Sequence, residues 1–141
     1  MSERLNFENT SKKKEELHLL ESLKKLGIVI EADPIQKESA YFIKFPFEKD
    51  IITTIRILFN HDNGTDLVIT NMTTLPDNQT GQGFGSKAIQ QLLQWAKENN
   101  LTNIMAVQVQ GNSEKFWTKN GFIRDKEPNE CNDFVYQNDS Q

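Results

Sequence analysis

The sequence predicts an α/β fold built on one mixed sheet, and three observations support this prediction. Helical apolar spacing appears twice, near the start of the chain and again in its second half. Between these two segments lie four stretches rich in β-branched and aromatic residues. After the second helical segment, strand and helix patterns alternate, which favours a parallel strand pair beside antiparallel ones. We therefore expect a central, mostly antiparallel sheet flanked by helices, in a single domain over residues 1–141.

The first helix is expected over roughly residues 11–26. Thr10 or Ser11 can cap its start, and Gly27 stands where a left-handed cap would end it. Four leucines at three- and four-residue spacing form its apolar face: Leu19, Leu20, Leu23 and Leu26. His18, within this helix, is expected either on its surface or in helix packing, and no function is assigned to it.

Four strands are expected after this helix. They are Ile28–Ile30, Tyr41–Phe47, Ile51–Phe59 and Asp66–Leu75. The Asn-Gly pair in His61–Gly64 favours a tight reversal between the last two strands, which would make them antiparallel. Pro46 lacks a main-chain donor and indicates a sheet edge or a bend.

The second half of the chain alternates between helix and strand patterns. A helix is expected from near Gly85 to Asn99 or Asn100. Its apolar face consists of Ala88, Ile89, Leu92, Leu93 and Ala96. The elements expected after it are a strand at Ile104–Val109, a short helix at Glu114–Lys119, and strands at Phe122–Asp125 and Asp133–Gln137.

Composition excludes several classes of partner. The chain has 16 basic and 20 acidic residues, so its net charge of -4 argues against a nucleic-acid-binding role. No apolar run approaches the roughly 20 residues that a membrane helix needs. The single cysteine, Cys131, cannot form an intramolecular disulfide, and no leader-like segment opens the sequence, so we expect a cytoplasmic protein.

Three glycines at alternate positions stand between the expected strand ending at Leu75 and the following helix. Gly81, Gly83 and Gly85 would let an anion approach the main chain at the positive end of that helix. An ordinary glycine-rich turn would have the same spacing. A P-loop is excluded, because Ser86 precedes Lys87 and the required frame is missing.

A dinucleotide-binding fingerprint is a further alternative, because Gly83–Ala88 reads G-x-G-x-x-A. That motif normally closes the first strand of its unit and is followed, about 20 residues on, by an acidic residue for the ribose. Here several strands precede the loop, and the next strand region, Ile104–Gln110, carries glutamines and no acid.

The stretch Leu75-Pro76 with Thr80-Gly81-Gln82-Gly83-Phe84-Gly85-Ser86 resembles the acetyl-CoA pyrophosphate loop of the GNAT superfamily of N-acetyltransferases, whose pattern is Gln/Arg-x-x-Gly-x-Gly/Ala. Thr80 stands where the family has Gln or Arg. Either Gln79, one residue earlier, takes that place, or the loop carries one extra residue after Pro76. A second segment, Asn112–Phe122, resembles the family's Asn-x-x-Ala-x-x-Phe-Tyr-x-Lys-x-Gly-Phe region in shortened form. The resemblance covers roughly residues 50–125.

The resemblance implies a GNAT-type fold that binds acetyl-CoA as cosubstrate, without a metal. The residues it assigns to the cofactor are Leu75, Gln79, Thr80, Gly81, Gln82, Gly83, Phe84, Gly85, Ser86, Asn112 and Trp117. It also implies a bulge in the strand that runs to Leu75, with a main-chain N–H meeting the thioester carbonyl. Pantetheine would lie between this strand and Ile104–Val109. Asn112 could equally cap the short helix that follows it.

The resemblance also implies transfer of an acetyl group to a primary amine, of a small molecule or of a protein lysine or N-terminus. The acidic charge balance suits a cationic acceptor such as a polyamine, an aminoglycoside or a lysine-bearing protein. A homodimer is possible. No catalytic residue is assigned, because Trp117 occupies the position of the family's tyrosine acid and an indole N–H is not a practical acid.

The sequence offers replacements for that acid and for the base. Water or one of Ser113, Cys131 and Tyr136 could protonate the thiolate, although Cys131 is expected to be buried. Ordered water held by Asn71 or Thr73 could accept the amine proton. A second interpretation is a non-catalytic CoA-binding or protein-interaction domain of the same fold, and on that interpretation Trp117 serves packing alone.

Overall fold

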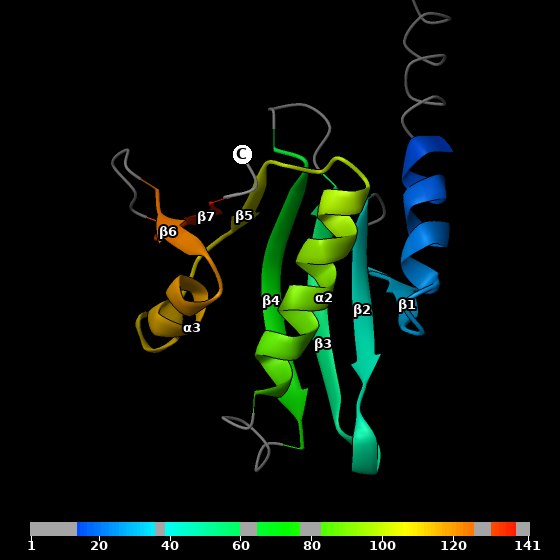
Figure 1. The fold of residues 1–141 in the computed structure, drawn as a ribbon, viewed down its shortest axis with the longest axis horizontal. Coiled ribbons are helices and arrows are strands. Elements are labelled where there is room, and N and C mark those ends of the chain that lie inside the picture. Colours follow the sequence, from blue (N-terminus) through cyan, green and yellow to red (C-terminus); the bar gives the residue numbers. More distant parts are fainter. Residues whose placement is uncertain (1–13, 36–38, 60–64, 77–82, 126–130, 138–141) are drawn as a thin grey trace, which may run out of the picture.

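A computed structural model describes residues 14–35, 39–59, 65–76, 83–125 and 131–137 of the chain (Figure 1). Its strands are β1 (Val29–Ala32), β2 (Ala40–Pro46), β3 (Ile52–Phe59), β4 (Leu67–Leu75), β5 (Ile104–Ala106), β6 (Phe122–Arg124) and β7 (Phe134–Tyr136). Its helices are a first helix over residues 14–24, α2 (Phe84–Glu98) and α3 (Glu114–Lys119). Two short 3-10 turns are η1 (Glu48–Asp50) and η3 (Gly111–Ser113). No helix in these ranges is long and apolar enough to cross a membrane.

The described strands form one mixed sheet in the order β1-β2-β3-β4-β5-β7-β6. Neighbours are antiparallel except β4 and β5, which run parallel and are joined through α2. The mixed, mostly antiparallel sheet flanked by helices is therefore confirmed. The reversal expected at His61–Gly64 lies outside the described residues, but β3 and β4, the strands on either side of it, are antiparallel as predicted.

Pro46 lies at a bend and at a local edge of the described sheet. It is the last residue of β2 and pairs with Ile52 of β3, whereas the pairing of β2 with β1 ends at Lys44. The chain then turns through η1, closed by a hydrogen bond from the Phe47 N–H to the Ile51 carbonyl (2.7 Å). A missing proline donor costs little at such a strand end.

The helix over residues 14–24 ends as its sequence indicates. Gly27 has a φ of 79° and donates its N–H to the Lys24 carbonyl (3.0 Å), so the left-handed cap is confirmed. Leu20 and Leu23 are buried against the sheet. Leu26 is 38% exposed, contrary to the expected apolar face, because it follows the last helical residue and leaves the 3.6-residue repeat.

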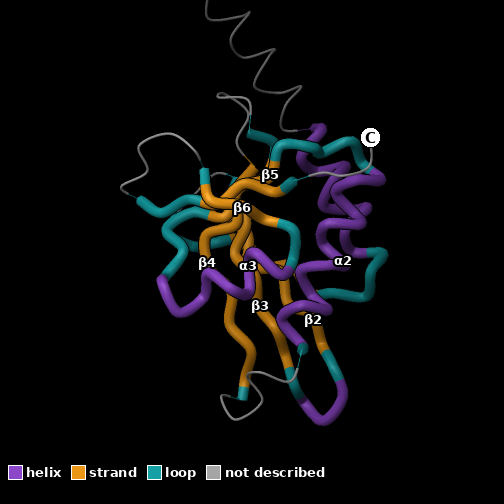
Figure 2. Tube along the Cα trace, turned by 60° about the vertical axis from the view of Figure 1, so that its left-hand side comes forward, coloured by secondary structure: helices purple, strands orange, loops and turns teal. Residues whose placement is uncertain are grey.

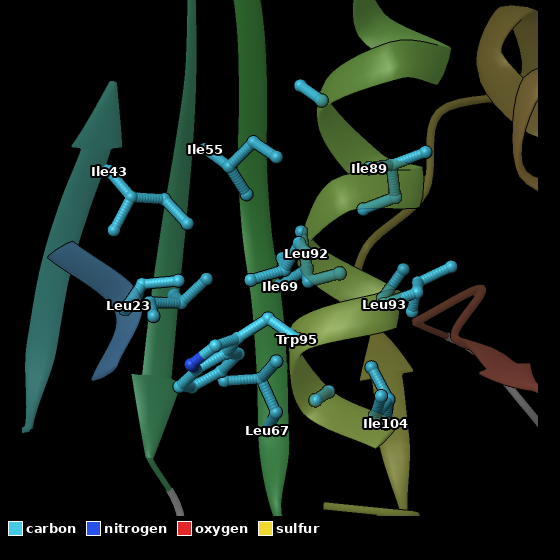
Figure 3. Close-up of a cluster of buried hydrophobic side chains, with 14 of the residues drawn as sticks. Leu23, Ile43, Ile55, Leu67, Ile69, Ile89, Leu92, Leu93, Trp95 and Ile104 are labelled. Carbon is cyan, nitrogen blue, oxygen red and sulfur yellow. The ribbon is translucent and has the colours of Figure 1, made fainter. Parts of the chain in front are cut away.

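Both long helices pack on the same face of the sheet, and the core lies between them and the strands (Figures 2 and 3). The buried residues of α2 are Ala88, Ile89, Leu92, Leu93, Trp95 and Ala96. The sequence pattern predicted all of these except Trp95. The Trp95 indole N–H donates to the Ser22 hydroxyl (3.2 Å), which ties α2 to the first helix. Full burial of each large apolar side chain contributes roughly 1.5–3 kcal/mol.

A buried carboxylate attaches the first helix to the sheet. Glu16 is 5% exposed and accepts hydrogen bonds from the Ser39 hydroxyl (2.7 Å) and from the Tyr41 phenol. Burial, and then the hydrogen bond and charge of Glu16, raise the pKa of Tyr41 above its ordinary 10.0. Tyr41 also packs edge-on against Phe59, with ring centroids 6.0 Å apart.

The Tyr41 phenol should make the stability of the fold sensitive to alkaline pH. In the unfolded chain the phenol ionises near pH 10, whereas in the folded protein it stays protonated, so its contribution is full below pH 10 and declines above it. At pH 8, Tyr41→Phe should lower the free energy of unfolding by roughly 1.5–3 kcal/mol, because a hydrogen bond to a carboxylate is lost. Urea unfolding at pH 8 and 10.5 should show this difference narrowing. A constant difference between the two pH values would contradict the assignment.

Candidate functional site

The candidate site is a groove that opens where β4 and β5 separate. Their parallel pairing runs only from Leu67 with Ile104 to Ile69 with Ala106, and it ends with a hydrogen bond from the Val107 N–H to the Ile69 carbonyl (3.0 Å). β4 then continues towards one end of the sheet, while the segment that follows β5 turns away from it (Figure 1). The volume of the groove is about 800 Å³.

The chain leaves β4 because its main chain bonds elsewhere. The Gln108 N–H donates to the carboxylate of Asp133 (3.0 Å), and the Val109 N–H donates to the Asn132 carbonyl (3.1 Å). The Asn132 carboxamide returns a hydrogen bond to the Val109 carbonyl (2.6 Å). Gln108 also adopts a positive φ of 54°. The strand predicted at Ile104–Val109 is therefore shorter than expected and ends at Ala106.

A bulge in β4 faces this separation. Ile57 pairs with Ile69, but the preceding residue of β3, Arg56, pairs with Asn71, so Thr70 is an extra residue. Such an insertion bends a strand and increases its local twist. The bulge expected in the strand that runs to Leu75 is thus confirmed, and it lies beside the last residue that pairs with β5.

The start of α2 forms one end of the groove. Gly83 is its N-cap, with a φ of 88°, and its carbonyl accepts the Lys87 N–H (3.0 Å). The N–H groups of the first helical turn lie before the helical hydrogen-bond pattern begins and at the positive end of the helix dipole. Four predicted cofactor residues from this turn line the groove: Gly83, Phe84, Gly85 and Ser86. The arrangement can accept an anion.

Gly85 has a different role from Gly83. A Cβ at Gly85 would lie 3.3 Å from the Phe116 ring and 3.4 Å from the Met72 methyl group. Its missing side chain therefore allows α2, α3 and β4 to pack closely together. At Gly83 a Cβ would meet nothing within 4 Å, and it is the positive φ that favours glycine.

The opposite wall comes from η3 and α3. Asn112 and Trp117, both predicted cofactor residues, line it together with Ser113 and Phe116. Asn112 lies within η3, and the N-cap of α3 is Ser113, which makes no side-chain cap hydrogen bond. The expectation that Asn112 caps the helix is therefore wrong.

Trp117 belongs to the groove and to the core at once. It is 6% exposed and meets the rings of Phe116 and Phe122 edge-on, with centroids 5.1 and 5.0 Å away. The two alternatives proposed for this residue, packing beside a cofactor and core packing, are thus compatible in geometry. Its contact with Phe122 holds α3 against β6, since Phe116 belongs to α3 itself.

The two walls are linked by Asn120, the residue after α3. Its carboxamide N–H groups donate to the Ser86 hydroxyl (3.1 Å) and the Phe116 carbonyl (2.9 Å), and its oxygen accepts from the Gln90 side chain (2.9 Å). Asn120 is 6% exposed. Because Ser86 and Gln90 belong to α2, this one residue sets the spacing between α2 and α3.

Five predicted cofactor residues remain, and of these the structure describes only Leu75, which is not among the residues that line the groove. Leu75 is the last residue of β4 and is 56% exposed. The others lie outside the described residues: Gln79, Thr80, Gly81 and Gln82. The cofactor roles of all five stay predictions.

Several lining residues were not assigned to the site from the sequence. They are Ile69, Thr70, Met72, Thr74, Val107, Gln108, Val109, Gln110, Phe116 and Lys119. The position of the two diverging strands follows from the element order, which could have indicated the β4 residues. Lys119 stands in the segment that resembles the family's Phe-Tyr-x-Lys pattern, which was a usable signal.

The replacement acids and bases are unevenly placed. Ser113, Asn71 and Thr73 line the groove. Tyr136 packs against Phe122, with ring centroids 5.3 Å apart, and is not a lining residue; Cys131 is exposed, so its expected burial is wrong. His18 is exposed, which agrees with the surface position, whereas His61 lies outside the described residues.

Charged groups are scarce at the groove. Among the described residues that line it, Lys119 is the one charged side chain. The described part of the chain contains no cluster of three or more His, Cys, Asp or Glu side chains that could hold a metal ion. The described lining therefore offers main-chain groups, hydroxyls, carboxamides and the Lys119 ammonium group.

This mixed sheet, whose parallel pair opens beside the N-terminus of α2, resembles a solved structure. The crystal structure of GCN5 from Tetrahymena matches with a TM-score of 0.56 over 71% of this chain and 69% of that chain, at 10% sequence identity. The chain belongs to the acetyltransferase (GNAT) family, whose model matches residues 7–122. No curated protein sequence matches it closely enough to count as a relative. The resemblance and the fold predicted from it are confirmed.

The link through Asn120 should be important for stability as well as for the shape of the groove. Asn120→Ala removes three hydrogen bonds at a buried position and should lower the free energy of unfolding by about 2–3 kcal/mol. Asn112→Ala, at an exposed position of the same groove, is the matched control and should change it by less than about 0.5 kcal/mol. Urea unfolding measures both, and equal losses would contradict the assigned role.

Proposed function

We propose that this protein is an acetyl-CoA-dependent N-acetyltransferase acting on a primary amine of a small molecule or of a protein. The observation that carries the proposal is the groove itself, in which two strands part beside the N-terminus of α2. Membership of the acetyltransferase (GNAT) family supports the reaction class. When bound, acetyl-CoA would supply an acetyl thioester that an amine can attack.

The residues of the groove fit the cofactor at two places. At the start of α2, the N–H groups around Gly83 and Ser86 suit a pyrophosphate, and Gln79–Gln82 would extend this contact. Between β4 and Val107–Gln110, main-chain groups that would otherwise pair across the sheet suit the amides of pantetheine. On this proposal, Trp117 and Asn112 border the arm from the α3 side.

A main-chain donor next to the bulge suits the thioester carbonyl. The Met72 N–H donates to the carboxamide oxygen of Asn71 (2.9 Å), and both residues line the groove. The Asn71 side chain is exposed, so its oxygen can give way to a substrate carbonyl. The N–H would then stabilise the negative charge that develops on that oxygen during attack.

Proton transfer would proceed without a strong side-chain acid or base. Asn71 and Thr73 can hold a water molecule that accepts a proton from the amine, and Ser113 or water can donate to the departing thiolate. Trp117, at the position of the family's tyrosine, would contribute shape to the site and no proton. The lining residues described offer no carboxylate to an acceptor, so any preference for a cationic amine would rest on the net charge of -4.

The pyrophosphate site predicts that a side chain at Gly83 abolishes cofactor binding. Gly83→Glu places a negative charge where phosphate would meet the main chain, so calorimetry should detect no acetyl-CoA binding to this variant. Gly27→Glu is the matched control, because Gly27 has a similar φ (79° against 88°), has nothing within 4 Å of a Cβ, and ends a different helix.

Gly27→Glu should bind acetyl-CoA like the wild type although it carries the same backbone strain. Equal loss in both variants would show that strain, and not the phosphate contact, weakens binding. A wild-type protein that does not bind millimolar acetyl-CoA would overturn the proposed function.

If water or Ser113, and not Trp117, transfers the proton, replacing Trp117 should have only a small effect on the rate of the chemical step. Trp117→Phe keeps an aromatic ring between Phe116 and Phe122, and kcat for thiol release should fall by less than about threefold. The assay measures release of free CoA with a panel of amines, including polyamines, aminoglycosides and lysine peptides. A loss of kcat of a hundredfold or more, with the fold intact, would assign the indole to catalysis.

The same panel tests a second candidate function. Trp117 in place of the tyrosine acid also suits a domain that binds CoA or a protein partner without catalysis. Tight acetyl-CoA binding with no thiol release for any amine would favour this alternative.

A further inference from the structure

We propose that Arg56 is a positioning residue that holds the β4 bulge in the shape needed for acyl transfer. This inference rests on the proposed function, because it concerns the main-chain donor expected to meet the thioester carbonyl. Arg56 is opposite the bulge on β3, but on the sheet face away from the core, since its neighbours Ile55 and Ile57 are both fully buried on the helix side.

The guanidinium of Arg56 contacts the extra residue directly. Its Nη1 donates to the Thr70 hydroxyl (2.8 Å), and that hydroxyl lies 3.4 Å from the Arg56 carbonyl. The side chain and main chain of Arg56 therefore hold Thr70 from one strand. A bulge residue lacks a regular partner in the ladder, so its conformation depends on such side-chain contacts.

The guanidinium is itself fixed by a buried carboxylate. Its Nε and Nη2 both lie 2.8 Å from one carboxylate oxygen of Asp33, whose side chain is only 8% exposed. The other carboxylate oxygen accepts the Ile35 N–H (2.9 Å), and the Asp33 N–H donates to the Ala40 carbonyl (3.0 Å). Asp33, the residue after β1, is thus held by several contacts of its own.

The Phe42 ring packs beneath the guanidinium, with its centroid 5.9 Å from Cζ. Arg56 is consequently held on one side by Asp33, on another by this ring, and at its tip by Thr70. A chain of contacts leads from Asp33, just after β1, to the bulge, across β2 and β3.

The bulge decides which main-chain donor faces the groove. The Ile69 carbonyl points towards β5, where it accepts the Val107 N–H. Because main-chain groups alternate along a strand and Thr70 adds one residue, the next donor directed away from β3 belongs to Met72. A change at Thr70 would rotate this N–H, and misplacement by about 1 Å can lower a rate by about a hundredfold.

Only an arginine can make these contacts together. Its planar guanidinium offers donors in several fixed directions, so it can bind Asp33 and Thr70 at once, whereas a lysine offers one compact ammonium group. Arg56→Lys should therefore keep the charge pair with Asp33 and lose the hold on the bulge. A loss of activity in Arg56→Lys would therefore show that Arg56 positions the bulge and does more than pair its charge with that of Asp33.

The test compares five variants with the wild-type chain. Arg56→Lys and Arg56→Met remove the guanidinium that donates a hydrogen bond to Thr70. Thr70→Val removes only the hydroxyl that accepts this bond and keeps the branched shape of the side chain. Thr70→Ser restores a hydroxyl and is the conservative rescue. Lys44→Met is the matched control, because it breaks an exposed ion pair with Glu31 (3.0 Å) on the same sheet face, away from the bulge.

Arg56→Lys, Arg56→Met and Thr70→Val should lower kcat about tenfold to a hundredfold while the Kd for free CoA changes less than about twofold. Thr70→Ser and Lys44→Met should stay within about threefold of the wild-type kcat. Hydrogen exchange of the Met72 amide should accelerate in the first three variants only. If Arg56→Met does not fold, Thr70→Val carries the test.

Two results would overturn the proposal. One is a Thr70→Val variant that keeps the wild-type kcat and an unchanged rate of hydrogen exchange at the Met72 amide. The other is a set of Arg56 variants in which the affinity for CoA falls by as large a factor as kcat. If the wild type transfers acetyl to no amine, the proposed function fails separately. Hydrogen exchange, together with the relative affinity for acetyl-CoA and CoA, then still decides whether Arg56 shapes the bulge.

Discussion

The short hydrogen-bonded seam between β4 and β5 is the constraint on which the rest of the site depends. Three residue pairs join the strands, and both strands depart from the ladder immediately afterwards. On one side the departure is the bulge at Thr70, and on the other it is the shift of Gln108 and Val109 to Asp133 and Asn132, just before β7. Because both strands leave regular pairing directly after the pair Ile69–Ala106, a groove opens between them at that point.

The elements around the seam add the parts that a ligand would need. α2 brings its N-terminus to the groove, since it connects the two parallel strands, and α3 closes the far side through the aromatic contacts of Trp117. Asn120 joins these helices, so a change in one wall is transmitted to the other. The buried Glu16 and Trp95 secure the first helix to the sheet and to α2, respectively.

Much of the fold could be predicted from the sequence, because apolar periodicity reports burial along each segment. The buried face of α2 and the bounds of α3 follow from the spacing of residues such as Leu92 and from the Asn120-Gly121 stop. The cap at Gly27 was equally readable, because a left-handed residue there strongly favours glycine. These features are local, and local sequence determines them.

Features that depend on partners distant in sequence were not predictable. The premature end of β5 comes from hydrogen bonds to Asn132 and Asp133, about 25 residues away, which leave no trace in the pattern of Ile104–Val109. The burial of Glu16 and the packing reason for Gly85 also come from contacts with other elements. The sequence indicated a bulge in β4 only through family resemblance, and its exact residue required the register with β3.

The two outermost described strands have a consequence for how copies of the protein meet. β1 has four residues and β6 has three, and charged Glu31 and Arg124 lie on them. Such short, charged strands expose few main-chain groups for pairing, which protects a sheet from adding further strands. The two edges of the described sheet therefore offer a further strand little to pair with, so contact between copies of the protein by extension of the sheet is disfavoured there.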